Sequence, residues 1–146
     1  MEKENLFIDD KGKLRFEGEY LYNFKLKGKE YIREILEYEG DFIYNQKWNG
    51  KGYDKKGNII YELNNGNGKS KEYDKDGRLM FEGEYLNGKR TGKGKEYDFL
   101  GKLDFYGEYL NGKKWNGMGK EYVSVTKWDA ELRIYEYLEG KRFYNY

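Results

Sequence analysis

The repeating unit of this chain is clearest at residues 79–97, which read Leu-Met-Phe-Glu-Gly-Glu-Tyr-Leu-Asn-Gly-Lys-Arg-Thr-Gly-Lys-Gly-Lys-Glu-Tyr. Because side chains alternate between the two faces of a strand, Phe81, Gly83 and Tyr85 share one face and the residues between them share the other. Asn87-Gly88 is a strong signal for a two-residue hairpin turn. This unit therefore predicts a β-hairpin with one aromatic face and one charged face.

The same unit recurs five times between residues 14 and 122. Residues 105–113 read Phe-Tyr-Gly-Glu-Tyr-Leu-Asn-Gly-Lys and align with Phe-Glu-Gly-Glu-Tyr-Leu-Asn-Gly-Lys at residues 81–89. The copies close on tyrosines spaced 20 to 25 residues apart, namely Tyr31, Tyr53, Tyr73, Tyr97 and Tyr122. Because such a period marks a repeat architecture, we expect one domain over residues 1–146. Within it, residues 1–13 form a half-repeat or cap, and residues 123–146 form a connector and a capping half-repeat.

The junctions between hairpins carry a turn signal of their own, an Asp followed three residues later by Gly. Asp can hydrogen-bond the backbone of its own turn, and Gly accepts the positive φ that closing such a turn often needs. Four junctions follow this pattern, at residues 9–12, 54–57, 74–77 and 98–101. We therefore predict an all-β fold, an elongated and twisted antiparallel meander of successive β-hairpins in an open single-layer sheet. Short helices are expected only around residues 32–37 and 128–132.

The glycines of the returning strand predict how the two faces of each hairpin pack. A recurring glycine within a strand indicates that another group approaches the backbone closely, so Phe81 and Tyr85 are expected to lie over Gly92 and Gly94. On the other face, acidic side chains are expected to pair with lysines, each pair contributing roughly 0.2–1 kcal/mol. The expected partners are Glu82 and Glu84 opposite Lys93 and Lys95.

Composition limits the functions that this chain can perform. Aromatic residues make up 19% of the chain, which argues for a folded protein although 38% of its residues are charged. The net charge of +1 removes the field expected of a nucleic-acid-binding protein. The chain has no Cys and no His, so it lacks thiol nucleophiles, thiolate metal ligands and the commonest general base. We expect no catalytic residues, no metal site and no cofactor.

Neither a secretory signal nor an apolar run long enough to span a membrane is present in the sequence. Residues 1–14 are charged, with only Leu6-Phe7-Ile8 apolar near the start. We therefore expect a cytoplasmic protein.

The run Phe-Glu-Gly-Glu-Tyr-Leu-Asn-Gly-Lys-Arg-x-Gly-Lys-Gly at residues 81–94 resembles the MORN repeat, whose pattern is Tyr-x-Gly-x-Trp-x-Asn-Gly-x-x-x-Gly-x-Gly. The copies here carry no His in the hairpin loop and replace the frequent Trp with Tyr20, Phe42, Tyr85 and Tyr109. They are closer to degenerate MORN-variant repeats, some of which occur in antitoxin-like bacterial proteins. The resemblance implies a meander of hairpins with a groove lined by rings, which serves as an interaction platform.

Three motifs that suggest specific chemistry have simpler explanations in the repeat. The Gly-Lys strings at residues 92–95 and 117–120 lack the following helix that a phosphate-binding loop requires. The paired carboxylates recur opposite lysines, whereas a glycosidase uses one unique pair in a cleft. The acidic turns at residues 9–12 and 74–77 lack the ligand spacing of a calcium loop.

The candidate binding residues are the rings that repeat along the aromatic face. Trp48 and Trp115 occupy equivalent hairpin positions, each followed by Asn-Gly, and could either cover the sheet or contact a ligand. A single-layer sheet must bury its aromatic face by curvature, by its own rings or by a partner. The predicted groove consists of Tyr20, Tyr38, Phe42, Trp48, Phe81, Tyr85, Tyr109 and Trp115.

We expect a non-enzymatic scaffold that binds a protein partner, such as a toxin-like protein, through this groove. One alternative is peripheral attachment to anionic phospholipid through lysines and exposed rings. A second alternative is carbohydrate binding or sugar hydrolysis, suggested by carboxylates beside aromatics. Because an open meander leaves edge strands unpaired, self-association through edges or ends is a further expectation.

Overall fold

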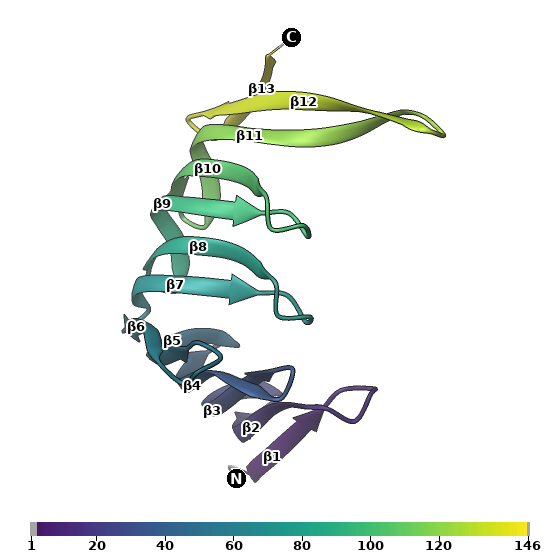
Figure 1. Cartoon of the computed structure of the whole chain (residues 1–146). Helices are drawn as coiled ribbons and strands as arrows, with labels where there is room; N and C mark the ends of the chain where they lie inside the picture. Colours follow the sequence, from purple (N-terminus) through teal and green to yellow (C-terminus); the bar gives the residue numbers. More distant parts are fainter. Residues whose placement is uncertain (1–2, 146) are drawn as a thin grey trace.

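The computed structural model describes residues 3–145, and these contain no helix. Thirteen strands follow one another in a single antiparallel sheet, whose spatial order is the order of the sequence (Figure 1). The predicted all-β meander of hairpins in one open sheet is confirmed. The strands are β1 (Lys3–Ile8), β2 (Leu14–Leu21), β3 (Phe24–Ile32), β4 (Ile35–Ile43), β5 (Gln46–Tyr53), β6 (Ile59–Asn64), β7 (Asn67–Tyr73), β8 (Leu79–Leu86), β9 (Lys89–Tyr97), β10 (Leu103–Leu110), β11 (Lys113–Thr126), β12 (Asp129–Leu138) and β13 (Lys141–Asn145).

Two-residue turns close the hairpins, as Asn87-Gly88 predicts. Asn87 and Gly88 have φ values of 52° and 74°, the two positive values of a turn whose twist matches that of the flanking strands. The same geometry occurs at residues 22–23, 33–34, 44–45, 65–66, 111–112 and 139–140.

Both predicted short helices are wrong. In the first, Arg33 and Glu34 adopt positive φ and form the turn between β3 and β4. In the second, the chain turns at residues 127–128 between β11 and β12. These segments lack glycine turn signals, yet pairing of the strands on either side of them determines their conformation.

The Asp-x-x-Gly junctions form the turns predicted for them. Asp9 Oδ1 accepts hydrogen bonds from the backbone N–H groups of Lys11 and Lys13, at 3.0 and 2.9 Å. Gly12 has a φ of 74° and donates its N–H to the Asp9 carbonyl. Residues 54–58, 74–78 and 98–102 repeat these bonds.

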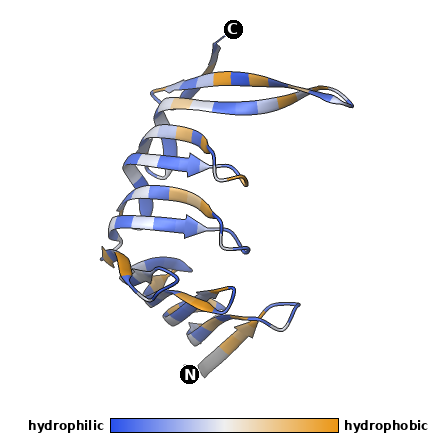
Figure 2. Cartoon of the chain, viewed as in Figure 1, coloured by the Kyte–Doolittle hydropathy of each residue, from blue (hydrophilic) through white to orange (hydrophobic). Residues whose placement is uncertain are grey.

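Aromatic rings line one face of the sheet, called here the ring face, and lie directly on the backbone. A Cβ atom added at Gly83 or Gly94 would come within 2.7 or 2.8 Å of the Phe81 ring, so only glycine fits beneath it. Figure 2 shows hydrophobic and hydrophilic residues interleaved along the strands, as this two-faced pattern requires. The equivalent buried rings in successive hairpins are Phe16, Tyr38, Tyr61, Phe81, Phe105 and Tyr135.

Two details of the predicted hairpin packing are wrong because of a bulge. Gly83 pairs with Gly94, but the next residue, Glu84, pairs with Thr91. Gly92 and Lys93 therefore have no opposite residue on β8 and form a bulge in β9. Gly92 therefore lies beside the Glu84 side chain and not under a ring. Glu82 does lie opposite Lys95 as expected, whereas Glu84 lies opposite Thr91 on β9 and has its opposite lysine, Lys69, on β7.

The sheet is nearly divided between β6 and β7. These strands pair only at Leu63↔Gly68 and Asn64↔Asn67, because the shortened third hairpin supplies fewer residues. The buried residues accordingly form two clusters, one on each side of this joint. The first contains Phe16, Tyr38, Phe42, Tyr61 and Leu63, and the second contains Phe81, Phe105, Tyr109 and Tyr135.

Candidate functional site

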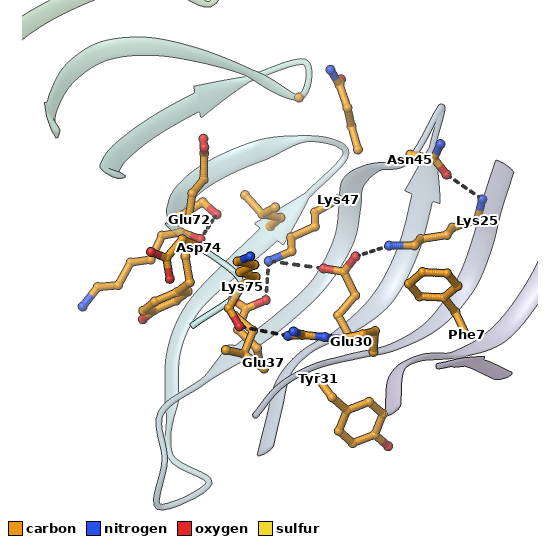
Figure 3. Close-up of a pocket in the computed structure, with 18 of the residues that line it drawn as sticks. Phe7, Lys25, Glu30, Tyr31, Glu37, Asn45, Lys47, Glu72, Asp74 and Lys75 are labelled. Carbon is orange, nitrogen blue, oxygen red and sulfur yellow. Dashed lines mark hydrogen bonds and ion pairs between the residues drawn. The ribbon is translucent and has the colours of Figure 1, made fainter. Parts of the chain in front are cut away.

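A groove of about 880 Å³ lies over the ring face. Its floor comes from β3, β5, β7, β8 and β9, and its walls come from the β1–β2 and β7–β8 turns. Arg15 Nη1 donates a hydrogen bond to the Lys75 carbonyl at 3.0 Å and joins the two walls (Figure 3). The groove is therefore bounded by segments that lie 60 residues apart in the sequence.

A cation covers each of the main buried rings on this face. Lys25 Nζ lies 4.9 Å from the centre of the Phe16 ring, and Lys47 Nζ lies 5.0 Å from that of Tyr38. In the second half of the sheet, the Arg90 guanidinium lies 3.9 Å from the Phe81 ring centre. Lys114 covers Phe105 in the same way at 4.5 Å. Attraction between a cation and a ring face contributes about 0.5–2 kcal/mol per pair, so this layer stabilises the rings as well as covering them.

Carboxylates hold the cations of the first half in place. Lys25 pairs with Glu30 at 2.5 Å, and Lys47 lies between Glu30, at 3.7 Å, and Glu37 (Figure 3). Glu37 is buried, with 6% of its surface exposed, and also accepts a hydrogen bond from the Tyr61 hydroxyl at 2.5 Å. A buried carboxylate needs compensating partners, and Lys47 and Tyr61 supply them to Glu37.

A second network repeats this arrangement in the other half. Arg90 donates two hydrogen bonds to Glu72, at 3.0 and 2.7 Å, and one to Glu96 at 3.0 Å. Glu96 also accepts a hydrogen bond from the Tyr109 hydroxyl at 2.9 Å and forms an ion pair with Lys114 at 3.0 Å. Throughout the described residues, every buried side-chain nitrogen or oxygen has a hydrogen-bond partner.

Burial and ion pairing shift the pKa values of two groups in these networks away from neutral pH. Burial, followed by the charge of Glu37, raises the pKa of Tyr61 far above its usual range. Burial alone would lower the pKa of Arg90, but its bond to Glu72 and the charges of Glu72 and Glu96 raise it overall. Neither Tyr61 nor Arg90 is therefore poised to exchange protons as a general acid or base near neutral pH.

Comparison with known proteins adds no assignment to this geometry. The chain matches no protein-family model, and no curated protein matches it significantly. The part of the chain that the structure describes holds no cluster of three or more residues able to ligate a metal ion. Among the same residues, no helix has the length and apolar character needed to cross a membrane.

The predicted aromatic residues lie beneath the charged layer, and most of them are not on the surface of the groove. Tyr38, Phe42, Phe81 and Tyr109 are buried, with at most 3% of their surface exposed. Tyr20 is half-buried and packs against the first cluster. Tyr85 contacts both clusters, and it alone of the eight predicted rings lines the groove. A ligand in the groove would therefore meet lysine, arginine and carboxylate groups before it met most of these rings.

The two tryptophans pack onto the turns of later hairpins. A Cβ at Gly66 would lie 2.7 Å from the Trp48 ring, and one at Gly140 would lie 3.1 Å from that of Trp115. The N–H groups of these two glycines donate to the carbonyls of Trp48 and Trp115. Of the two roles considered for them, covering the sheet is the one that their contacts support.

The charged residues of the groove are the component that the candidate list misses. Their sequence signal is a cation five residues after the second ring of a hairpin, as in Tyr20 and Lys25 or Tyr85 and Arg90. This offset crosses the turn, so the hairpin register places the cation opposite that ring, at Tyr20↔Lys25 and Tyr85↔Arg90. The recurrence at Phe42–Lys47, Tyr109–Lys114 and Tyr137–Arg142 makes the pattern detectable from sequence alone.

Proposed function

We propose that this protein is a non-enzymatic interaction module, a MORN-like repeat array that binds a protein partner through the charged groove. The observation that carries the proposal is the groove's lining, which includes eight basic and seven acidic side chains fixed above a floor of rings. An antitoxin-like role, in which the partner is a toxin-like protein, is consistent with the resemblance of the repeats.

The arrangement of charges supports binding in preference to catalysis. The carboxylates of both networks are each paired with a lysine or an arginine, and the pattern repeats from hairpin to hairpin. A catalytic site needs a group whose pKa is matched to proton transfer near the working pH. A repeated and neutralised array instead provides a binding surface that carries both charge signs.

The expected partner is a protein segment that carries both charge signs. A strongly basic or acidic segment would meet like charges as well as opposite ones in this lining, whereas a segment with both signs could match it. Such complementarity acts mainly on the rate of association and on specificity, so binding should weaken as salt concentration rises.

The test is affinity capture from the source cell, comparing two double charge reversals. Lys11 and Lys75 are exposed and lie on the two walls of the groove, so Lys11→Glu with Lys75→Glu changes the groove without disturbing its floor. Lys29→Glu with Lys51→Glu makes the same charge change on the opposite face of the sheet. We expect the first variant to lose the partner and the second to keep it. Equal capture by both variants would contradict the proposal.

A second candidate function, attachment to anionic membranes, is favoured by one observation. Trp128, at the tip of the projecting β11–β12 hairpin, is 88% exposed, and Lys127 Nζ lies 5.2 Å from its ring centre (Figure 1). An exposed Trp beside a Lys suits the interface of an anionic bilayer. Sedimentation with phosphatidylserine vesicles at low salt, compared between the wild type and Trp128→Ser, decides this alternative. If the wild type does not sediment with the vesicles, membrane attachment is ruled out.

A further inference from the structure

The tips of the first two hairpins place tyrosines in a backbone conformation that suits them poorly. Tyr22 and Tyr44 both have a φ of 48°, in the left-handed region that bulky residues rarely adopt. Three other turns have Asn65, Asn87 or Asn111 at this position, and Asn tolerates the left-handed region well, whereas the two remaining turns have Arg33 and Glu139 there. The two tyrosines therefore impose a conformational cost that asparagine would avoid.

Packing does not compensate for this cost. Tyr22 is 86% exposed and Tyr44 is 77% exposed, so neither ring is buried by the fold. Phe24, at the start of β3, is also 42% exposed and meets the Tyr44 ring edge-to-face at a centroid distance of 5.5 Å. Strained, exposed residues at equivalent tips point to a role outside the fold itself.

These two tips, like the tip at residues 64–67, also lack charged residues. Residues 21–24 read Leu-Tyr-Asn-Phe and residues 43–46 read Ile-Tyr-Asn-Gln, without a charged residue, in a chain that is 38% charged. The corresponding tips at residues 86–89, 110–113 and 138–141 each end in Lys. The first two tips thus form an uncharged surface of three rings with neighbouring amides.

The two tips are held in a fixed relation to each other. Asn45 Oδ1 accepts a hydrogen bond from the backbone N–H of Lys25 at 2.9 Å, which ties the second turn to the first hairpin. Equivalent tips are separated by two strands, or about 9–10 Å at the usual strand spacing. This is roughly the length of a disaccharide unit.

We propose that Tyr22, Phe24 and Tyr44 form a second binding site, which takes a segment of a neutral oligosaccharide. Ring faces stack on the apolar faces of sugar rings, and the amides of Asn23 and Gln46 hydrogen-bond hydroxyl groups without requiring a charge on the ligand. A stable protein interface occupies about 800 Å² on each partner, more than two hairpin tips provide. A nucleotide would bring phosphates, but the nearest cations, Lys25 and Lys47, already pair with Glu30 and Glu37.

The test titrates the full chain with hexasaccharides of glucose (α- and β-linked), xylose, mannose and N-acetylglucosamine. Binding is measured by calorimetry and by changes in amide NMR chemical shifts. At least one probe should bind saturably at millimolar concentration or below, with shifts centred on residues 21–25 and 43–46. The variant Tyr22→Asn with Tyr44→Asn should weaken binding at least tenfold. Because Asn suits the turn, this variant should keep or raise the melting temperature, which separates loss of binding from loss of fold.

Trp128→Ser, which removes an equally exposed ring elsewhere, is the matched control and should bind as the wild type does. Binding by no probe, or equal binding by the double tyrosine variant, overturns the proposal. Concentration-dependent self-association that disappears in the same double variant would also overturn it, by assigning the tips to contact between copies. Gln46 lines the charged groove as well, but Lys11 and Lys75 lie on the β1–β2 and β7–β8 turns, so Lys11→Glu with Lys75→Glu should leave sugar binding unchanged.

Discussion

Each main buried ring of the sheet is held between glycine backbones beneath it and a cation above it. Phe81 shows the arrangement best, with no exposed surface, Gly83 and Gly94 below, and the Arg90 guanidinium 3.9 Å from its centre. Phe81→Ala should reduce the free energy of unfolding by about 3–5 kcal/mol, since it removes a buried ring and leaves a cavity. Urea denaturation measures the loss. Phe99→Ala, which truncates a ring that is 66% exposed, should change stability by less than about 0.5 kcal/mol, and similar losses from both variants would contradict the role given to Phe81.

The shifted tyrosines should make the stability of the fold fall as the pH becomes alkaline. The hydrogen bond from the Tyr97 hydroxyl to Glu82 raises the pKa of Tyr97 to about 12, and burial raises the pKa of Tyr61 and Tyr109 as well. A raised pKa in the folded state means that the folded chain holds these protons more tightly than the unfolded chain, whose tyrosines titrate at 10.0. Their contribution is therefore complete below pH 10 and is lost as the pH rises toward 12.

Denaturation midpoints measured from pH 8 to 12, with tyrosinate absorbance as a second signal, test this dependence. We expect stability to fall steadily above pH 10. Tyr97→Phe, which removes one of the shifted hydroxyls, should show a smaller fall, whereas Tyr22→Phe, at an exposed ring, should behave as the wild type. An unchanged slope in Tyr97→Phe would show that the bond to Glu82 does not contribute.

Asparagine side chains connect several of the hairpins to their neighbours. Asn116 Oδ1 accepts a hydrogen bond from the backbone N–H of Glu139 at 2.9 Å, and Asn67 Oδ1 accepts one from the backbone N–H of Asn87 at the same distance. Asn116→Ala should cost about 0.5–1.5 kcal/mol and speed hydrogen exchange at Glu139, because that N–H loses its acceptor. Asn116→Asp keeps an acceptor oxygen and should restore most of the protection. Equal exchange in the Ala and Asp variants would mean that the side chain does not hold this turn.

The hairpins were predictable because their signals are local. Asn87-Gly88 defines its turn, Asp9 and Gly12 define theirs, and alternation separates the ring face from the charged face. The bulge that moves Gly92 out from under the rings was not predictable, because it depends on how β8 and β9 pair over their whole length. The charged groove was missed for a related reason. Hairpin register places its cations over the rings, but its walls meet only through the curvature that brings the β7–β8 turn to Arg15.

The joint between β6 and β7 divides the molecule into two parts with separate cores. Only two residue pairs join these strands, and no residue belongs to both buried clusters, although Tyr85 contacts each from the side. In repeat proteins stability is approximately the sum of local units and the interfaces between neighbours. A weak interface in the middle of the array should therefore allow one half to open while the other stays folded.

Native-state hydrogen exchange of two variants tests this division. Phe16→Ala should lower protection in β2–β5 by more than in β8–β12, and Phe105→Ala should do the reverse, because each removes a fully buried ring from one cluster. Neither substitution removes the Arg15–Lys75 or the Gly88–Gly66 hydrogen bond, both of which cross the joint, so coupling that remains between the halves can be attributed to such contacts. If either variant lowered protection equally in both halves, the chain would unfold as one cooperative unit. The groove would then be a rigid template, whereas independent halves would let its walls move apart to admit a partner.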